Sequence, residues 1–466
     1  MMEEKRMDAE VLEYKFYTED ATDYLLYSEK EDGTLSVSIG EAGKFTHIDI
    51  PRFYNGKIVS EIAENGFKLN GVLPNRKLRS ITIPNSVTKI GRCAFADCVH
   101  LATVVIPDSV TEICEYAFSS CEDLVDITIP DSVTSLGKNA FALCNKLTNV
   151  VVGKSITIIE KGMFYRCPKL KRISLPPSLV MIDEGAFEHC ERLSTFVIPE
   201  GVATIGKEAF AFCESMKNIR IPSSVTEIGA KAFSSCEKLE NVIFSPGLSI
   251  IGYEAFARCK SLQSITIPDS VSNISCYAFV SCLNLQRIEV GADNRSYKSI
   301  DGNLYSFDGQ TLLVYAKGKE ESHFSVPQGV RVIGNGAFSV CENLTSVTIP
   351  DSVTTIGGNA FSSCTNLTNV TMGEGMREIG SCAFAVCKNI TSITIPKSVT
   401  KIGSSAFYQC DSLAKVYFKN TKGWEEVFFS TATKGTSIPS LKLRNPVTAS
   451  EFLRETYCSR HWICHK

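Results

Sequence analysis

The sequence predicts an α/β repeat solenoid, and three observations lead to this prediction. A phenylalanine recurs every 23 residues, a cysteine follows each of these phenylalanines after three residues, and a short alternating run ending in proline precedes most pairs. A fixed period of this size is typical of solenoids, in which neighbouring coils bury a continuous core. The phenylalanines form two runs: Phe95, Phe118, Phe141, Phe164, Phe187, Phe210, Phe233, Phe256 and Phe279, then Phe338, Phe361, Phe384 and Phe407.

One coil, residues 124–147, illustrates the elements that we expect in each repeat. Ile127, Thr128 and Ile129 alternate as in a short strand with its isoleucines facing inward, and Pro130 ends that strand because it has no N–H group. Gly137 is expected to adopt a left-handed turn. The spacing of the apolar residues that follow predicts one face of a short helix: Ala140, Phe141, Cys144 and Leu147.

The repeat pattern L-x-x-I-x-I-P-x-x-V-x-x-I-G-x-x-A-F-x-x-C, as in residues 344–364, closely resembles the BspA-like type of leucine-rich repeat. The resemblance covers residues 67 to about 418. It implies a leucine-rich-repeat horseshoe or arc of about fifteen coils, with a parallel sheet on the concave face and short helices or turns on the other. It also implies a surface or secreted protein that adheres to host or matrix proteins, because that is the usual proposed role of such proteins.

Breaks in the repeat divide the chain into five predicted parts. Residues 1–66 lack the repeat and are expected to form an N-terminal cap, residues 67–290 and 328–418 are leucine-rich repeats, and residues 419–466 form a C-terminal cap and tail. Residues 291–327 form one long coil that contains a hairpin.

The hairpin is predicted around Asp308 and Gly309, because this pair lies between the apolar segments 304–307 and 312–315. We expect it to replace the short helix of one coil. It is either a structural irregularity or a protrusion that binds a partner, since insertions in solenoids often map to functional faces.

Composition excludes some functions and leaves the location of the protein open. A net charge of −3 and an isoelectric point near 6.2 give no basic surface for nucleic acid. No apolar run reaches the length of a membrane helix, and the acidic start of the chain lacks the apolar stretch of a secretory signal. An intracellular scaffold or effector is therefore the alternative to a surface antigen or adhesin.

The cysteines are expected to be buried free thiols, although disulfides between neighbouring coils remain the alternative. Of the 19 cysteines, 13 occupy one position of the repeat, which is the pattern of a core residue. The tail holds four potential zinc ligands within eight residues, a spacing too compressed for a common zinc finger: Cys458, His461, Cys464 and His465.

No catalytic motif is present in the sequence. Gly153, Lys154 and Ser155 resemble the end of a phosphate-binding loop, but Thr148 stands where the first glycine is required. The sequence also lacks G-x-S-x-G and H-E-x-x-H. We therefore expect a protein that is not an enzyme and has no cofactor.

The outward positions of the predicted strands are the candidate binding surface. Most are serine, threonine or asparagine, which suit an exposed strand and could also bind an ordered glycan or ice. The exceptions are Lys171, Arg172, Lys217 and Arg220, whose charge Glu240 partly offsets. The sequence thus predicts a non-catalytic protein–protein interaction module whose basic patch faces an acidic protein partner, such as a host or extracellular matrix protein, unless these residues are an ordinary solvated face.

Overall fold

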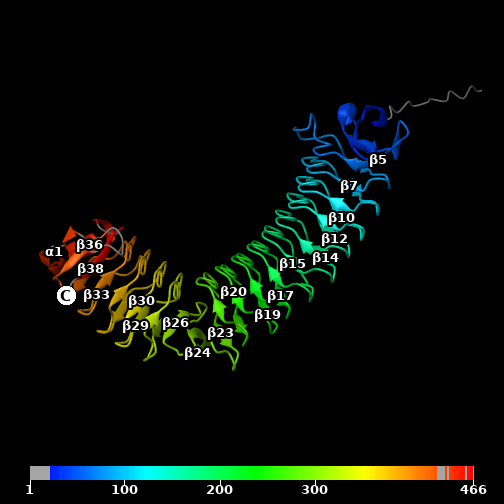
Figure 1. Cartoon of the computed structure of the whole chain (residues 1–466). Helices are drawn as coiled ribbons and strands as arrows, with labels where there is room; N and C mark the ends of the chain where they lie inside the picture. The colour runs from blue at the N-terminus through cyan, green and yellow to red at the C-terminus, as the bar shows by residue number, and fades with distance from the viewer. Residues whose placement is uncertain (1–20, 428–435, 438–439, 457–458, 465–466) are drawn as a thin grey trace, which may run out of the picture.

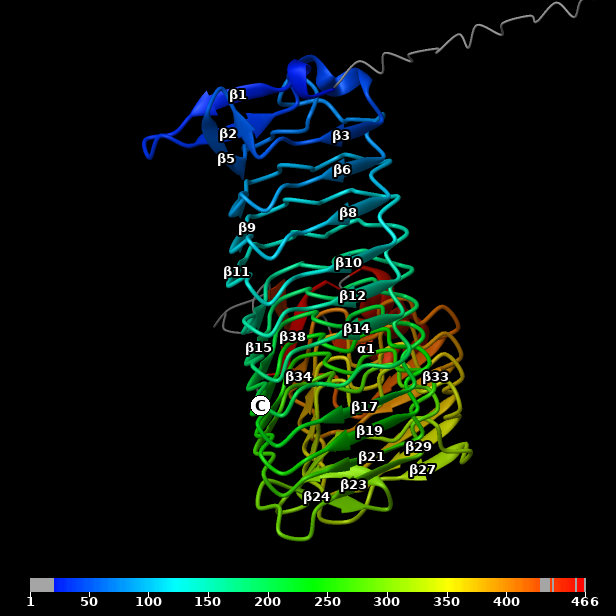
Figure 2. The same cartoon turned by 90° about the vertical axis from the view of Figure 1, so that its right-hand side faces the viewer.

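The computed structural model describes residues 21–427, 436–437, 440–456 and 459–464. In these residues the chain forms an elongated arc, a β-solenoid of about 17 turns with parallel strands (Figure 1). Most coils contribute two short strands, which stack into two rows along the body (Figure 2). The predicted solenoid is therefore confirmed.

The first-strand row contains the strands that precede the repeat proline, and its members are β3 (His47–Asp49), β6 (Ser80–Thr82), β8 (Thr103–Val105), β10 (Asp126–Thr128), β12 (Asn149–Val151), β14 (Arg172–Ser174), β17 (Asn218–Ile221), β19 (Asn241–Phe244), β21 (Ser264–Ile267), β23 (Arg287–Val290), β27 (His323–Ser325), β29 (Ser346–Ile349), β31 (Asn369–Met372), β33 (Ser392–Ile395) and β35 (Lys415–Phe418). Within each of six short sheets of this row, neighbours pair in parallel with like positions opposite each other, as Asn149 lies opposite Arg172.

The second-strand row contains β2 (Leu35–Ser38), β5 (Lys57–Ile62), β7 (Lys89–Ile90), β9 (Glu112–Ile113), β11 (Ser135–Leu136), β13 (Ile158–Ile159), β15 (Met181–Ile182), β16 (Thr204–Ile205), β18 (Glu227–Ile228), β20 (Ile250–Ile251), β22 (Asn273–Ile274), β26 (Thr311–Val314), β28 (Val332–Ile333), β30 (Thr355–Ile356), β32 (Glu378–Ile379) and β34 (Lys401–Ile402). In most of these strands the last isoleucine or leucine is buried in the core, whereas the residue before it is partly or fully exposed.

The segment around each repeat phenylalanine is a series of turns, so the predicted short helix is wrong for the described coils. Around Phe118, for example, Tyr116 and Ser120 have φ values of 57° and 59°, which an α-helix does not allow. The N–H groups of these three residues donate to carbonyls of the next coil over 2.8–2.9 Å. The alternating φ values bring the apolar side chains inward at the spacing that a helix would also give.

The repeat glycine is required for close packing between coils rather than for a left-handed turn. Gly137 does not have a positive φ, and a Cβ atom there would lie 2.2 Å from the backbone nitrogen of Glu115 in the preceding coil. A side chain at this position would clash with the backbone of the preceding coil, and the clash could be relieved only if one coil moved away from the other.

Columns of phenylalanine and cysteine fill the core. Phe210 and Phe233 stack with ring centroids 5.2 Å apart, and both are fully buried. The Cys236 thiol donates a hydrogen bond to the Phe210 carbonyl over 3.2 Å, and Cys259 repeats this contact with Phe233. All cysteines of the described residues are free, so cysteine serves here as a small apolar residue with one weak donor.

The core and both rows are interrupted at the long coil. The hairpin predicted around Asp308 is confirmed, because β25 (Asn303–Ser306) pairs antiparallel with β26, and β24 (Tyr297–Ile300) adds a third antiparallel strand. One apolar cluster ends at Leu304 and a second begins at Tyr305. These strands lie near the lowest point of the arc, so the solenoid consists of two stacked halves that meet there (Figure 1).

Both ends of the solenoid are covered by non-repeat elements. The N-terminal elements are η1 (Ala21–Tyr24), β1 (Leu26–Glu29), η2 (Gly40–Lys44) and β4 (Phe53–Tyr54), although β2, β3 and β5 already belong to the two rows. The C-terminal elements are β36 (Trp424–Val427), β37 (Thr436–Ser437), α1 (Ser440–Arg444), α2 (Pro446–Glu451), η3 (Phe452–Thr456) and β38 (His461–Cys464). The antiparallel pairing of β38 with β34 and the burial of Trp424 and Trp462 close the last coil. The five-part division of the chain stays a prediction.

Candidate functional site

The five residues predicted to bind a partner lie on the outer surface of the first-strand row. Arg172 begins β14 and Arg220 lies in β17. Lys171 immediately precedes β14, Lys217 immediately precedes β17, and Glu240 immediately precedes β19. All five are exposed. The strand register places Arg172 and Arg220 there, because alternate residues of a strand face opposite sides of the sheet.

Carboxylates neutralise only part of this basic patch. Lys217 Nζ lies 3.9 Å from a Glu240 carboxylate oxygen, and an Arg220 guanidinium nitrogen lies 3.7 Å from Glu200. Glu200 was not among the predicted residues, although it follows the repeat proline where most coils also carry a polar residue. Lys171 and Arg172 form no ion pair with any residue that the structure describes, so their charges face solvent.

A column of exposed apolar residues, which the sequence analysis did not single out, runs beside the basic patch. It occupies the central outward position of every second coil, where the exposed fractions are 79% for Val105, 47% for Val151, 83% for Val197 and 60% for Ile243. Arg220 takes the same position between Val197 and Ile243. The sequence contains this pattern, but it can be recognised only when the outward residues of successive coils are aligned.

The surface beside this column is hollowed. A hollow of about 650 Å³ is lined by Arg172, Ser174, Val197 and Glu200, among others, and a second of about 470 Å³ includes Arg220 and Ile243 in neighbouring coils. The coil between β14 and β17 has no first strand, so the row itself is interrupted there. The basic patch therefore coincides with these two hollows and with Val197 and Ile243, whereas Val105 and Val151 line a separate hollow with Asp126 and Asp131.

The C-terminal half provides an internal comparison, because its central outward positions carry hydroxyl groups. The exposed residues there are Ser325, Thr348, Thr371 and Thr394, followed by Tyr417, which is 43% exposed. Exposed apolar residues are ordinary when they are scattered singly, whereas the four residues of the apolar column recur at one position of alternate coils, with Thr128, Ser174 and Arg220 between them. The N-terminal half is therefore the better candidate surface.

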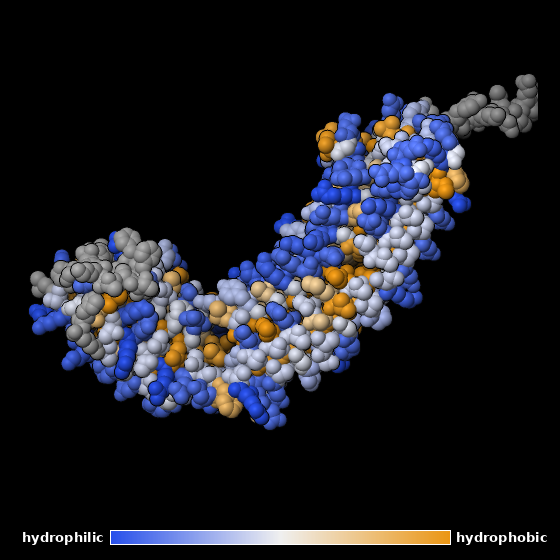
Figure 3. Space-filling view, viewed as in Figure 1, coloured by the Kyte–Doolittle hydropathy of each residue, from blue (hydrophilic) through white to orange (hydrophobic). Residues whose placement is uncertain are grey.

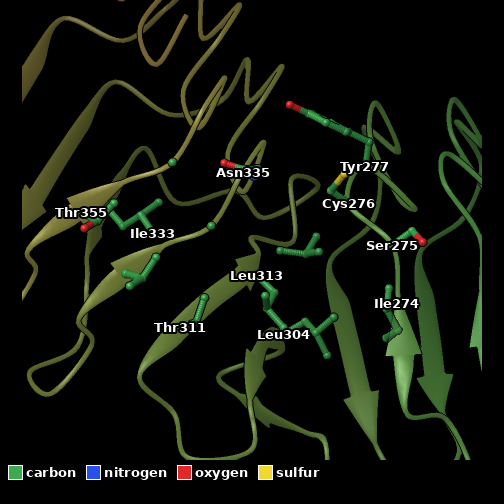
Figure 4. Close-up of a pocket in the computed structure, with 14 residues that line it drawn as sticks. Ile274, Ser275, Cys276, Tyr277, Leu304, Thr311, Leu313, Ile333, Asn335 and Thr355 are labelled. Carbon is green, nitrogen blue, oxygen red and sulfur yellow. The ribbon is translucent and has the colours of Figure 1, made fainter. Parts of the chain in front are cut away.

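Another hollow, the junction pocket, lies where the two halves meet, and Figure 4 shows residues from both halves around it. Its volume is about 360 Å³. Ile274, Cys276 and Tyr277 line it from the first half, Leu313 from the long coil and Asn335 from the second half. Figure 3 shows that elsewhere on the visible face apolar residues form separate patches between polar ones. This junction pocket is thus a candidate site of another kind.

The motifs considered for phosphate and zinc have structural roles where they are described. Lys154 Nζ lies 2.9 Å from Asp131 of the preceding coil, and the hydrogen bond with Lys154 lowers the pKa of that carboxyl. Cys458 and His465 lie outside the described residues. His461 and Cys464 occupy opposite faces of β38, and the Cys464 thiol donates to the Lys422 carbonyl over 3.2 Å.

The described part of the chain has neither a metal-binding cluster nor a membrane-spanning helix. Within it, no group of three histidine, cysteine, aspartate or glutamate side chains could hold a metal ion. Likewise, none of the helices among the described residues has both the length and the apolar character needed to cross a membrane.

Comparisons with solved structures find other leucine-rich repeat proteins. A leucine-rich repeat protein from Bacteroides ovatus is 28% identical with a TM-score of 0.52, over 85% of this chain and 93% of the other. A leucine-rich cell surface protein from Faecalibacterium prausnitzii is 25% identical with a TM-score of 0.44, over 86% and 94%. The pneumococcal vaccine antigen PcpA is 20% identical with a TM-score of 0.44, over 86% and 80%. No curated protein matches the chain.

The family model for the BspA type leucine-rich repeat region, in six copies, matches residues 70–194, 180–310 and 315–436. These ranges cover well over half of the chain and include both halves of the solenoid. The chain therefore belongs to the BspA-type leucine-rich repeat family.

Proposed function

We propose that this protein is a non-catalytic protein-binding module, and that it binds its partner through the first-strand row of the N-terminal half. The observation that carries the proposal is the apolar column, whose members Val197 and Ile243 flank Arg220 of the basic patch. Burial of such residues supplies affinity, and complementary charge chiefly speeds encounter and fixes orientation. Membership of a leucine-rich repeat family supports a binding role, because such domains generally bind proteins.

The partner surface that fits this site is acidic with apolar side chains. Lys171 and Arg172 offer charges without a carboxylate partner among the described residues, and Val197 protrudes in the next coil. As the family resemblance suggests, the partner would be a host or matrix protein and the chain a surface antigen or adhesin. Labelling of intact cells with an antibody to this chain tests that location, and signal only after cell rupture would favour the intracellular alternative.

The binding site is tested by charge reversal against purified matrix proteins and against proteins retained by the wild-type chain. Arg172→Glu with Arg220→Glu should lower the association rate, with an effect that shrinks as salt rises because the Debye length shortens. Lys415→Glu is the matched control, since Lys415 begins β35 at the position equivalent to Arg172. Equal loss in both variants, or loss in neither, would move the site away from this patch.

The apolar column is tested separately with Val151→Thr and Val197→Thr, which resemble the hydroxyl positions of the C-terminal half. These changes should raise the dissociation rate and leave the salt dependence unchanged, because they remove contact area and no charge. A partner whose dissociation is unaffected by both would not lie on the column.

A further inference from the structure

The outward face of the first-strand row in the N-terminal half alternates apolar ridges with hollows. The apolar column supplies the ridges, because its members protrude from every second coil. A hollow of about 700 Å³ lies between Val105 and Val151, and Thr128 lines it. Ser174 lines the hollow of about 650 Å³ beside Val197. A rod-shaped ligand that lies along the row would therefore meet ridges and hollows in turn.

The repeat distance of these ridges is about two turns of an α-helix. Strands of adjacent coils lie about 4.8 Å apart where they pair. The phenylalanine rings of the same coils, from Phe118 to Phe256, stack with centroids 5.2–5.9 Å apart. Two coils therefore repeat at about 10–11 Å, and seven residues of an α-helix rise about 10.5 Å.

Free charge changes sign along the same face. Asp108 and Asp126 line the first hollow, and neither forms an ion pair with any residue that the structure describes. Asp126 accepts a hydrogen bond from the neutral Asn149 amide over 2.6 Å, so it keeps its negative charge. Arg172 lines the second hollow and Lys171 precedes it, both without a carboxylate partner in the described chain. The face is thus acidic at its start and basic further along.

We infer that the partner of this face is an amphipathic α-helix of about 20 residues, with an apolar side chain at every seventh position. The inference rests on the proposed function and names the kind of partner that the site fits. A groove that takes one face of a helix is a recurrent mode of recognition, with anchors spaced by turns of the helix. The length follows from the distance between Val105 and Ile243, which spans six coils or about 30 Å.

The charges also fix the direction of the helix. An isolated helix is more stable with acidic residues in its first turn and basic residues in its last, because they offset its macrodipole. The acidic N-terminal end would lie over Lys171 and Arg172, and the basic C-terminal end over Asp108 and Asp126. Opposite charges across an interface favour this orientation over the reverse.

Two other extended partners fit the face less well. A β-strand rises about 3.3 Å per residue and presents alternate side chains to one face, so its repeat is about 6.6 or 13 Å. A polyproline helix repeats at about 9.3 Å, closer to the ridges. Its binding grooves are lined by aromatic side chains, however, and the apolar column consists of valine and isoleucine. The α-helix is therefore the partner that the observations favour.

The probes are four synthetic peptides of about 22 residues, labelled with fluorescein and capped at both ends. The acid–base peptide has an alanine and glutamine background, leucine at every seventh position, three glutamates at its start and three lysines at its end. The acid–acid peptide has glutamates at both ends. The shifted peptide has the composition of the first with leucine at every fifth position, and the proline peptide replaces the background by proline.

Fluorescence anisotropy at low salt measures the affinities. The acid–base peptide should bind at least about tenfold more tightly than the shifted peptide, because only a spacing of seven keeps the leucines on one face of the helix. It should also bind about tenfold more tightly than the acid–acid peptide, since like charges would then meet at one end. Circular dichroism at 222 nm should show a gain of helix when the acid–base peptide binds.

Two pairs of protein variants locate the peptide. Asp108→Lys with Asp126→Lys should invert the preference, so that the acid–acid peptide binds more tightly than the acid–base peptide. Thr128→Trp should fill the first hollow and weaken binding of the acid–base peptide at least about tenfold. Thr371→Trp is the matched control, because Thr371 is the third residue of β31 and Thr128 is the third residue of β10.

Four results would overturn the inference. They are no saturation by the acid–base peptide up to about 1 mM, equal binding of the shifted peptide, an unchanged preference in the aspartate variant, or tightest binding of the proline peptide. The proposed function fails separately, through the charge-reversal test on retained proteins. If Arg172→Glu with Arg220→Glu still slows their association while the helical peptides fail, the site stands and the helical partner is excluded.

Discussion

The replacement Phe233→Ala is the most direct test of the column that holds the coils together. Phe233 is fully buried, and its ring stacks on those of Phe210 and Phe256 with centroids 5.2 Å away on each side and interplanar angles of 5°. Its amide donates to the Ala255 carbonyl, and its own carbonyl accepts from the Cys259 thiol. The replacement removes the ring and keeps these backbone groups.

The expected loss in the free energy of unfolding is about 5 kcal/mol. Replacement of a buried phenylalanine by alanine costs about 3–5 kcal/mol, since both the transfer term and the cavity count. Each of the two stacked contacts contributes about 0.5–1.5 kcal/mol beyond burial, which places Phe233 at the upper end of that range. Because each coil contacts only its neighbours, this loss should open the coils near residue 233 first.

The assay is hydrogen exchange along the chain, together with urea unfolding. Exchange should accelerate near residues 210–256 and remain unchanged in the second half, which has a separate core. Phe307→Ala is the matched control, because Phe307 is 55% exposed next to the hairpin turn and its loss should cost less than about 0.5 kcal/mol. A uniform acceleration through both halves, or equal costs for the two replacements, would refute this account of the solenoid.

Three further predictions concern thiols, packing and pH. Burial raises the pKa of Cys236 to about 12. This thiol and the other column thiols should therefore react slowly with iodoacetamide at pH 8, while the exposed Cys276 reacts quickly. Stoichiometric disulfides between coils in the unreduced protein would contradict this prediction. Gly229→Ala should lower the free energy of unfolding in urea by about 1–3 kcal/mol, because a Cβ atom there would lie 2.6 Å from the backbone of the preceding coil. Ser275→Ala, at the equivalent position where the repeat already has a side chain, should cost less. Equal costs would refute the packing explanation. Burial and a neighbouring arginine lower the pKa of His189, so the unfolded chain takes up the proton first and stability should fall as the pH drops through about 6.5. His189→Phe should remove this part of the pH dependence of the urea midpoint. An unchanged dependence would exclude His189 as its source.

Part of the candidate surface could be predicted from the sequence. The register of the repeat identified Arg172 and Arg220 as outward residues, and the structure has both exposed on the first-strand row. Glu200, which lies near Arg220, was missed because it belongs to the loop of another coil. The apolar column was missed because its members are 46 residues apart, and they form one surface only after the coils are stacked.

The sequence by itself determined the period, the inward residues and the burial of the 13 repeat cysteines. This was possible because every coil of a solenoid meets nearly the same neighbours, so the same core residues recur at each step. The hairpin could also be predicted from the sequence, because Asp308 and Gly309 specify a local turn whose geometry depends on few other residues.

Only the tertiary structure decided how each coil meets the next. The spacing around Phe118 fits a helix and a chain of turns equally well, and hydrogen bonds to a coil 22 residues away select the turns. The same is true of Gly137, whose constraint comes from the backbone of the preceding coil. At the junction, Tyr277 meets Asn359 from 82 residues away. These features depend on backbone groups of neighbouring coils, and the identity of the side chains within one repeat does not encode them.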